Sequence, residues 1–163
     1  MNTHRTPSNT SPIMAQPQVV EFNSKIPAYA YLSNFHPAPF EYNGLFWPTV
    51  EHAFQALKFP TNPDLQAKIR ASPTPAGAKA RGRRGAPLRP DWEEVKVSFM
   101  LELLKAKFAQ NQTLAIALKA TAPAQLREVS RTDSFWACGP NGCGKNMTGN
   151  LLHQVRKELL INA

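Results

Sequence analysis

The sequence contains only two cysteines, Cys138 and Cys143, among its 163 residues. Two thiols are too few for a fold held together by disulfides. No second pair of ligands accompanies their C-x4-C spacing, so we predict no metal site. The sequence also lacks an apolar run long enough to span a bilayer and an apolar N-terminal segment typical of a signal peptide. We therefore expect a cytoplasmic protein that has no membrane contact.

Acidic residues are scarce as well. Asp and Glu number 11 against 19 Lys and Arg, which gives a formal net charge of +8. An excess of positive charge favours an anionic partner, and a phosphorylated small molecule and a nucleic acid both qualify. Solubility alone is the competing interpretation of the charge. The length fits one domain with its own hydrophobic core.

Residues 1–18 are rich in Thr, Ser, Asn and Pro and show no hydrophobic periodicity. We predict a disordered N-terminal tail there and one domain over residues 19–163. Within that domain most apolar residues recur at helical spacing. Helix starts are expected at Pro48-Thr49, Asn62-Pro63, Ser72-Pro73, Asp91, Asn111 and about Thr148. The predicted fold class is mainly α, of the α+β kind, in a compact single domain with a few short strands.

Strands and loops are predicted from turn signals. Residues 19–22 are a candidate edge strand, and residues 41–47 fit a hairpin with Asn43-Gly44 as its turn. Residues 126–130 fit either a strand or the end of a turn. Residues 81–90 contain glycines, prolines and four arginines, so we predict a loop. Asp91, followed by a glutamate three residues later, resembles a capping box for the longest helix.

Residues 31–59, YLSNFHPAPFEYNGLFWPTVEHAFQALKF, connect a proline-containing loop, the hairpin and a helix. That helix carries Glu51 in its first turn, on a polar edge beside an apolar face. One interpretation is that this carboxylate complements the helix dipole and pairs with water or a nearby lysine. The other is that it points into a pocket walled by Asn34, Phe35 and Trp47. Periodicity does not decide between them.

Six motifs occur in a fixed order along the chain. They are SNFHPAPF at 33–40, WPTVEHAFQALKF at 47–59, SP at 72–73 with AK at 78–79 and GR at 82–83, RPDWEEVK at 89–96, DSFW at 133–136 and GKNMTG at 144–149. Together they resemble the NADAR family, the YbiA-like N-glycosidases, over residues 29–160. The sequence departs from the family pattern in having Ala137 in place of a glycine and Thr148 in place of a leucine.

The resemblance implies an enzyme that hydrolyses the C–N glycosidic bond between a ribose and an amine or base. Residue by residue, it implies Glu51 and Asp133 as catalytic carboxylates and Trp92 as a functional tryptophan. The reaction passes through a cationic sugar and needs a carboxylate near the sugar carbon, together with a group that activates water or protonates the leaving nitrogen. It needs no metal and no other cofactor. From the sequence alone, Trp92 also fits a core anchor and Asp133 a turn former.

Further residues are candidates for binding the rest of such a substrate. Lys79, Arg83 and Arg89 suit a phosphate group, and Asn34 and Asn146 suit ribose hydroxyls or phosphate. The remaining candidates are Phe35, Trp47, Trp136 and Gly149, the last of which lies where a helix N-terminus is expected to offer an anion site.

Two substrate classes are implied by the resemblance. One comprises ribosylamino-pyrimidine 5′-phosphates of the riboflavin pathway, and the other is ADP-ribose attached to guanine in nucleic acid. The excess of Lys and Arg leans slightly toward the larger polyanion. The alternative to an enzyme is a non-catalytic reader of ADP-ribose or nucleotides, which would not need both Glu51 and Asp133. A plain basic nucleic-acid binder is a third hypothesis.

Overall fold

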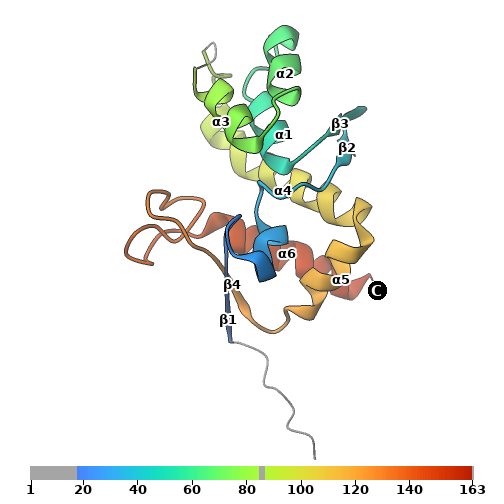
Figure 1. Cartoon of the computed structure of the whole chain (residues 1–163), viewed down its shortest axis with the longest axis vertical. Helices are drawn as coiled ribbons and strands as arrows, with labels where there is room; N and C mark the ends of the chain where they lie inside the picture. The colour runs from blue at the N-terminus through green and yellow to red at the C-terminus, as the bar shows by residue number, and fades with distance from the viewer. Residues whose placement is uncertain (1–17, 85–86, 163) are drawn as a thin grey trace, which may run out of the picture.

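The computed structural model describes residues 18–84 and 87–162. The predicted disordered tail lies outside the described residues except for Gln18, and so do residues 85–86 of the predicted arginine-rich loop. In chain order the elements are β1 (Val19–Phe22), the 3₁₀ helix η1 (Pro27–Leu32), β2 (Phe40–Tyr42), β3 (Leu45–Trp47), α1 (Val50–Ala56), α2 (Pro63–Arg70), α3 (Pro75–Arg84), α4 (Trp92–Gln110), α5 (Gln112–Ala120), β4 (Gln125–Glu128) and α6 (Met147–Ile161). This arrangement confirms the predicted mainly α fold with a few short strands (Figure 1). Within the described ranges no helix is long and apolar enough to cross a membrane.

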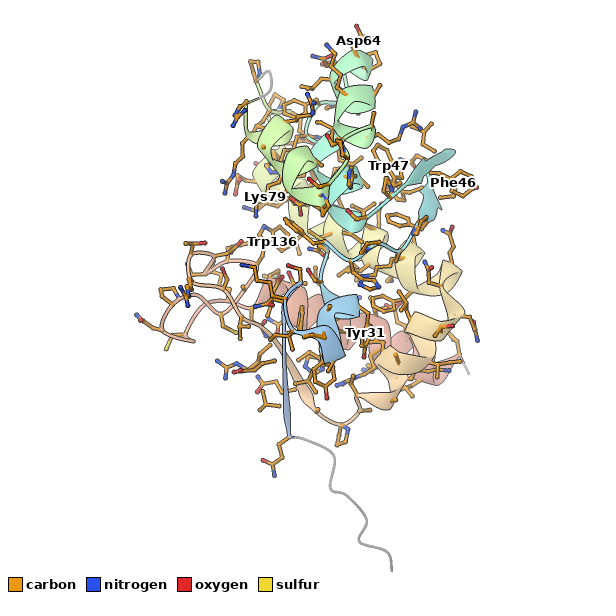
Figure 2. All side chains as sticks on the ribbon, in the orientation of Figure 1. Tyr31, Phe46, Trp47, Asp64, Lys79 and Trp136 are labelled. Carbon is orange, nitrogen blue, oxygen red and sulfur yellow. The ribbon has the colours of Figure 1, made fainter. Side chains whose placement is uncertain are left out.

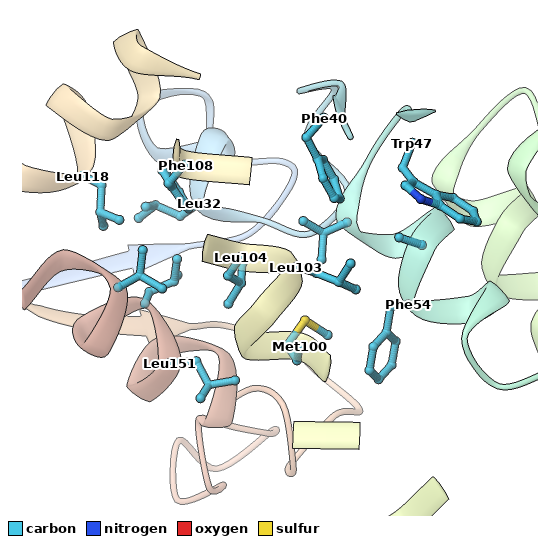
Figure 3. Close-up of a cluster of buried hydrophobic side chains, with 14 of the residues drawn as sticks. Leu32, Phe40, Trp47, Phe54, Met100, Leu103, Leu104, Phe108, Leu118 and Leu151 are labelled. Atoms are coloured by element: carbon cyan, nitrogen blue, oxygen red, sulfur yellow. The ribbon is translucent and has the colours of Figure 1, made fainter. Parts of the chain in front are cut away.

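Helix α4 is the element around which the others are arranged. It contacts α1 and β2 on one side and α5 and α6 on the other, so in Figure 1 it lies between an upper group of helices and a lower one. It buries side chains on several sides, among them Leu103, Leu104 and Phe108, which are labelled in the cluster of Figure 3. The sequence prediction of a central, broadly apolar helix is therefore confirmed.

The strands form two separate pairs. β2 and β3 are antiparallel, and the two residues between them, Asn43 and Gly44, have φ values of 52° and 73°. Two successive positive φ values are typical of the type I′ turn that suits a two-residue hairpin. The predicted hairpin is confirmed.

β1 and β4 are parallel neighbours, with Phe22 in register with Glu128. Residues 125–128 are therefore a strand rather than the end of a turn. The pairing continues just beyond both strands, where Val129 N donates to Phe22 O at 2.9 Å and Asn23 Nδ2 reaches Val129 O at 3.4 Å. It brings together two segments that lie far apart in the sequence, and both contribute to the cavity described below.

Two helix starts follow the predicted capping chemistry. Thr49 Oγ1 accepts the backbone N–H of His52 at the start of α1, and Asn62 Oδ1 accepts that of Leu65 at the start of α2. Helices α4, α5 and α6 begin within one residue of the predicted positions. Asp91 forms no capping hydrogen bond with α4, so the predicted capping box is wrong. Its carboxylate instead binds the Arg89 guanidinium through two bonds of 2.6 and 2.9 Å.

Helix α3 differs from its prediction at both ends. It begins at Pro75 rather than Pro73, because Thr74 Oγ1 accepts the N–H of Gly77 while the Ser72 hydroxyl donates to the last turn of α2. It continues through Arg84, so three of the four arginines assigned to a loop are helical. Packing of α3 against α1 and α2 outweighs the weak helix propensity of its glycines.

Candidate active site

A cavity of about 380 Å³ opens where α1, α3 and α4 face the segment that follows β4. The helical wall, as we call the first side, includes Glu51, Gln55, Lys58, Lys79, Arg83, Trp92 and Lys96. The strand wall opposite includes Glu128, Ser130, Asp133 and Trp136. Figure 2 labels one residue of each wall, Lys79 and Trp136. Loop residues 23–24 and 33–35 complete the lining.

Eight of the twelve predicted site residues line this one cavity. They are Asn34, Phe35, Glu51, Lys79, Arg83, Trp92, Asp133 and Trp136. The other four, Trp47, Arg89, Asn146 and Gly149, lie outside its lining. These eight residues come from five separate segments of the sequence and meet at one place, whereas Asn146 and Gly149 of the GKNMTG motif do not reach it.

Glu51 is held in the first turn of α1 with only 6% of its surface exposed. Its carboxylate accepts a hydrogen bond of 2.7 Å from Gln55 Nε2, one helical turn later. Burial raises the pKa of Glu51, while the Gln55 amide and the charges of Lys79, Lys58 and Arg83 oppose that shift. Of the two interpretations of Glu51, the geometry supports the one in which it faces a pocket.

Four cations belong to the same lining. Lys58, Lys79, Arg83 and Lys96 all come from the helical wall. Burial lowers the pKa of Lys58, and the neighbouring cations lower it further against the opposing effect of Glu51. Lys58 and Lys79 also lie over the rings of Trp92 and Phe35, each at 5.7 Å from the ring centroid. Cations gathered in this way around a partly enclosed space suit a bound anion.

The two tryptophans of the cavity are anchored by a third aromatic ring. Phe54 packs against Trp92 with ring centroids 4.9 Å apart and against Trp136 at 5.3 Å, edge to face. Trp92 is 6% exposed, so it serves the core and lines the cavity at once. The core-anchor interpretation of Trp92 is therefore confirmed, and its place in the lining is compatible with the functional role, which stays a prediction.

Asp133 also combines two interpretations. Its Oδ1 accepts the backbone N–H groups of Phe135 and Trp136 at 3.0 and 2.8 Å, which makes it a turn former. Ser130 Oγ in turn accepts the N–H of Asp133 at 3.0 Å. This local network fixes the carboxylate at the cavity lining.

Glu128, the last residue of β4, was not predicted as a site residue. It lines the cavity on the same side as Asp133, and its pKa is raised to about 7. Burial is the main cause, and the charges of Asp133 and Glu51 add to it. The Thr148 hydroxyl lies near enough to lower this pKa without reaching hydrogen-bond geometry. Three carboxyl groups therefore share one cavity.

Comparison with known proteins assigns the chain to a protein family. Residues 21–160 match the profile of the NADAR domain. The chain belongs to the NADAR family. It is 42% identical over 147 residues to N-glycosidase YbiA of Shigella flexneri, and the match covers 90% of this chain and 91% of that one. The NMR structure of YbiA from Escherichia coli has a TM-score of 0.82 at 41% identity, covering 91% of this chain and 89% of that one.

A more distant relative of this NADAR protein has a different name. A riboflavin biosynthesis protein of Vibrio vulnificus is 37% identical over 150 residues, which cover 91% of this chain and 40% of that protein. Together with YbiA, these relatives confirm the predicted family and fold and identify this NADAR protein as an N-glycosidase.

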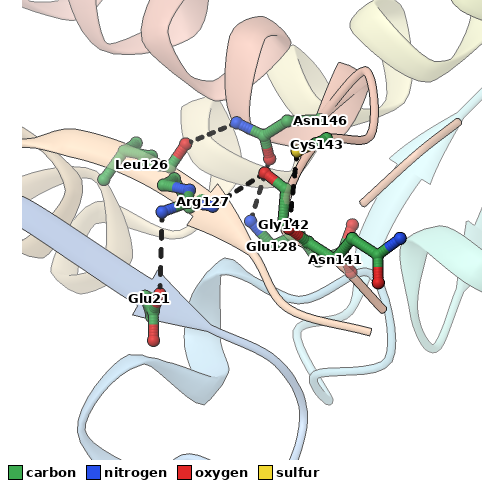
Figure 4. A network of polar contacts seen from close by, with 8 residues as sticks. All are labelled: Glu21, Leu126, Arg127, Glu128, Asn141, Gly142, Cys143 and Asn146. Atoms are coloured by element: carbon green, nitrogen blue, oxygen red, sulfur yellow. Dashed lines mark hydrogen bonds and ion pairs between the residues drawn. The ribbon is translucent and has the colours of Figure 1, made fainter. Parts of the chain in front are cut away.

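Asn146 and Gly149 of this NADAR protein support the site from behind the strand wall. Asn146 has a left-handed backbone, with φ of 50°, and its side chain is fully engaged with β4. Its Nδ2 donates to Leu126 O at 2.8 Å and its Oδ1 accepts the N–H of Glu128 at 2.9 Å (Figure 4). A Cβ on Gly149 would overlap Leu126 O, so only glycine lets α6 lie this close to the strand. The two residues position Glu128 rather than line the cavity.

Trp47 and Arg89 also differ from their predicted placement. Trp47, the last residue of β3, is buried in the core, where its Nε1 donates to Tyr42 O at 3.2 Å and the Arg70 guanidinium lies over its ring. Arg89 is bound to Asp91 and lies over the Phe99 ring, 5.1 Å from its centroid. Both residues therefore already have partners away from the cavity.

Three buried side-chain atoms without a hydrogen-bond partner occur within the described ranges, and two of them belong to residues that line this cavity. These two are Asn34 Oδ1 and Gln55 Oε1, and the third, Thr148 Oγ1, lies beside the lining residue Glu128. Such atoms are rare in folded proteins, and a role in binding or catalysis is one of the explanations for them. Their grouping supports the assignment of the cavity as the active site of this NADAR protein.

Behind the loop that carries Asn34 lies a buried lysine. Lys107 of α4 has no exposed surface and donates to Tyr31 O at 2.7 Å and Ser33 O at 3.0 Å. Burial lowers its pKa to about 7. A neutral amine keeps two N–H groups, which is the number that these two carbonyls require. Lys107 therefore ties the Ser33–Asn34 loop to the central helix.

Proposed function

We propose that this NADAR protein hydrolyses the C–N glycosidic bond of a ribosylated amine or base whose ribose carries a phosphate. One observation carries the proposal. A single cavity combines three carboxyl groups, four cations and two indole rings. These groups match what the reaction needs: acid and base catalysis, an anion site and a surface for a base.

The carboxyl groups suit different steps of the hydrolysis. The reaction breaks the bond between ribose C1′ and nitrogen, adds the oxygen of water to C1′ and delivers a proton to the leaving nitrogen. Glu128 suits the proton donor, because a pKa of about 7 keeps a large share of its carboxyl protonated at neutral pH.

Glu51 suits the complementary role. Lys58, Lys79 and Arg83 favour its carboxylate form, which can stabilise the cationic ribose and accept a proton from the attacking water. Asp133 has one oxygen bound to two backbone N–H groups. Its fixed position suits it to hold a ribose hydroxyl.

The remaining groups indicate the kind of substrate. The four cations suit the 5′-phosphate, and Trp92 offers a surface on which stacking is worth roughly 1–3 kcal/mol per base. A cavity of about 380 Å³ is small within the range of roughly 300–1,000 Å³ for small-molecule sites. It suits one phosphoribosyl unit and its base, which ribosylamino-pyrimidine 5′-phosphates and ADP-ribosyl-guanine share. The name of the Vibrio vulnificus relative supports the first class, and the net charge of +8 supports the second.

The test supplies both substrates to the purified protein and measures released ribose 5-phosphate or ADP-ribose. Glu51→Gln and Asp133→Asn remove one carboxylate each. Glu94→Gln and Asp64→Asn are matched controls, because both residues are exposed and outside the cavity. We expect release from at least one substrate, lost in the first two variants and kept in the controls.

The same experiment separates the enzyme from a non-catalytic reader. A reader would bind ADP-ribose tightly, release nothing from either substrate and bind as well after Glu51→Gln. That combination would overturn the proposed function for these substrates.

A further inference from the structure

A second cavity lies beside the active site. It has a volume of about 800 Å³ and shares Asn23, Ser24, Val129 and Ser130 with the first cavity. These shared residues follow directly after β1 and β4, whose parallel pairing places them side by side. The two cavities are therefore neighbours, and we call the four shared residues between them the ridge.

The lining of the second cavity is basic. It includes Lys25, Arg127 and Arg131 against a single acidic residue, Glu21. Lys25 and Arg131 are exposed and form no ion pair with any residue in the described ranges. Two cations without a protein partner are thus available to an anion that enters this cavity.

Arg127 is fixed between the strand and the glycine-rich loop. It donates to Gly142 O at 3.0 Å and lies 3.9 Å from the Glu21 carboxylate (Figure 4). Gly142 has φ of +70°, and a Cβ there would come within 3.0 Å of the Arg127 guanidinium. The glycine-rich loop therefore packs against Arg127, and both form part of the wall of the second cavity.

The ridge connects the second cavity to the catalytic loop. Ser130 lines both cavities, and its Oγ accepts the N–H groups of Thr132 and Asp133 at 3.2 and 3.0 Å. A ligand that crosses the ridge would pass directly over the segment that holds Asp133.

We propose that the second cavity is a phosphate-binding extension of the active site, which takes a phosphate-bearing unit attached to the substrate beyond the scissile ribose. The inference rests on the proposed function. The first cavity suits one phosphoribosyl unit and its base, so any larger substrate must leave it. The basic second cavity is the neighbouring space with room and charge for that extension. The unit is either the second half of ADP-ribose or the next nucleotide of a nucleic-acid strand.

Three substrates distinguish these possibilities. A ribosylamino-pyrimidine 5′-phosphate has no such unit, ADP-ribosyl-guanosine has the second half of ADP-ribose, and an oligonucleotide with ADP-ribosyl-guanine has both kinds. The variants are Lys25→Gln, Arg131→Gln and the two together. Lys157→Gln and Arg81→Gln serve as controls, because these exposed cations line neither cavity.

We expect the double variant to lower the ratio of kcat/KM for an extended substrate to that for the compact one by about tenfold, because charge-assisted contacts with phosphate are lost. The change should appear in KM rather than kcat, since the contacts lie away from the reacting atoms. An effect on both extended substrates assigns the cavity to ADP-ribose, and an effect on the oligonucleotide alone assigns it to the strand.

Two results would overturn the inference while leaving the glycosidase intact. One is an unchanged ratio in the double variant, and the other is an equal loss with all three substrates. Absence of release from every substrate by the unaltered protein would instead be a failure of the proposed function. In that case calorimetry with ADP-ribose, ribose 5-phosphate and a short guanine-containing oligonucleotide tests the cavity directly. Arg131→Gln must then weaken the binding of ADP-ribose or of the oligonucleotide more than that of ribose 5-phosphate, or the inference is wrong.

Discussion

The two walls of the candidate active site carry the same kind of acid in opposite surroundings. The helical wall places Glu51 among Lys58, Lys79 and Arg83, whose charges oppose the effect of burial on its pKa. The strand wall places Glu128 beside Asp133 and has no cation among its described lining residues. Burial and like charge therefore act together on Glu128. Burial raises the pKa of both groups, but three cations oppose the shift at Glu51, whereas Lys79 is the one cation among the described residues that opposes it at Glu128. This difference in surroundings is the basis for assigning Glu51 as the carboxylate and Glu128 as the acid.

The strongest test of this contrast removes the carboxylate of the helical wall. We expect Glu51→Gln to lower kcat/KM by about 1,000-fold, within the range for loss of an acid–base group. Thermal unfolding should be unchanged or shifted upward, because the fold disfavours a buried charge at this position. Activity assays and melting curves on the same preparation check both results. A large loss of stability would instead make Glu51 a structural residue.

Removing the acid of the strand wall should have a smaller and pH-dependent effect. We expect Glu128→Gln to lower kcat by about 100-fold. The unaltered enzyme should lose activity as the pH rises through about 7, because Glu128 then gives up the proton that it donates. The variant should lack this decline, and a pH–rate profile of kcat from 5 to 9 measures it. A profile of the same shape in both proteins would exclude Glu128 as the proton donor.

Glycines on the two walls sharpen the comparison further. A Cβ on Gly149 would overlap backbone at Leu126 O, whereas a Cβ on Gly82 would overlap the side chain of Gln55. Backbone cannot move aside, so we expect Gly149→Ala to lower the free energy of unfolding by about 2–3 kcal/mol. Gln55 can move, but it holds the Glu51 carboxylate. Gly82→Ala should therefore cost less than about 1 kcal/mol while lowering kcat about tenfold.

Denaturant unfolding and steady-state assays on both variants separate these effects. Gly77→Ala is the matched control, because Gly77 also lies in α3 but outside the cavity, with its nearest contact at 3.3 Å from a built Cβ. The opposite pattern, with activity lost in Gly149→Ala and stability lost in Gly82→Ala, would contradict the roles assigned to the two walls.

The two walls also differ in how far the sequence predicts them. Glu51 was placed correctly because a proline, a Thr cap and helical spacing are all local signals. Glu128 was missed because its place depends on the pairing of β4 with β1, which local periodicity does not show. The buried neighbour Leu126, two residues earlier in the strand, is the one signal that could have indicated its inward side.

The residues behind the strand wall show the same limit. Asn146 and Gly149 precede and begin a helix, so local reasoning assigned them to an anion site. In the structure both residues instead contact Leu126 of β4. This contact joins segments that are distant in the sequence, so local patterns do not reveal it. The arginines of α3 were assigned to a loop for a similar reason, since packing against α1 outweighs the glycines nearby.

Two titratable groups, Glu128 and the buried Lys107, should finally give opposite contributions to the pH dependence of the free energy of unfolding. The folded pKa of Glu128 is about 7 against an ordinary 4.5, so the folded state binds more protons between these values. Stability contributed by Glu128 is therefore present below 4.5 and lost as the pH rises to about 7. The folded pKa of Lys107 is about 7 against an ordinary 10.5, so here the unfolded state binds more protons. Stability should rise with pH above 7.

Lys107→Met removes the second effect and Glu128→Gln the first. We expect Lys107→Met to lose a rise of about 3 kcal/mol between pH 7 and pH 9.5, and Glu128→Gln to lose a fall of similar size between pH 4.5 and pH 7. Tyr31 and Tyr42 do not interfere, because their pKa values are raised to about 12. Urea unfolding at fixed pH steps measures both curves. If Lys107→Met left the upper window unchanged, the lysine would be charged in the folded state. The two carbonyls of the Asn34 loop would then bind an ammonium group rather than a neutral amine.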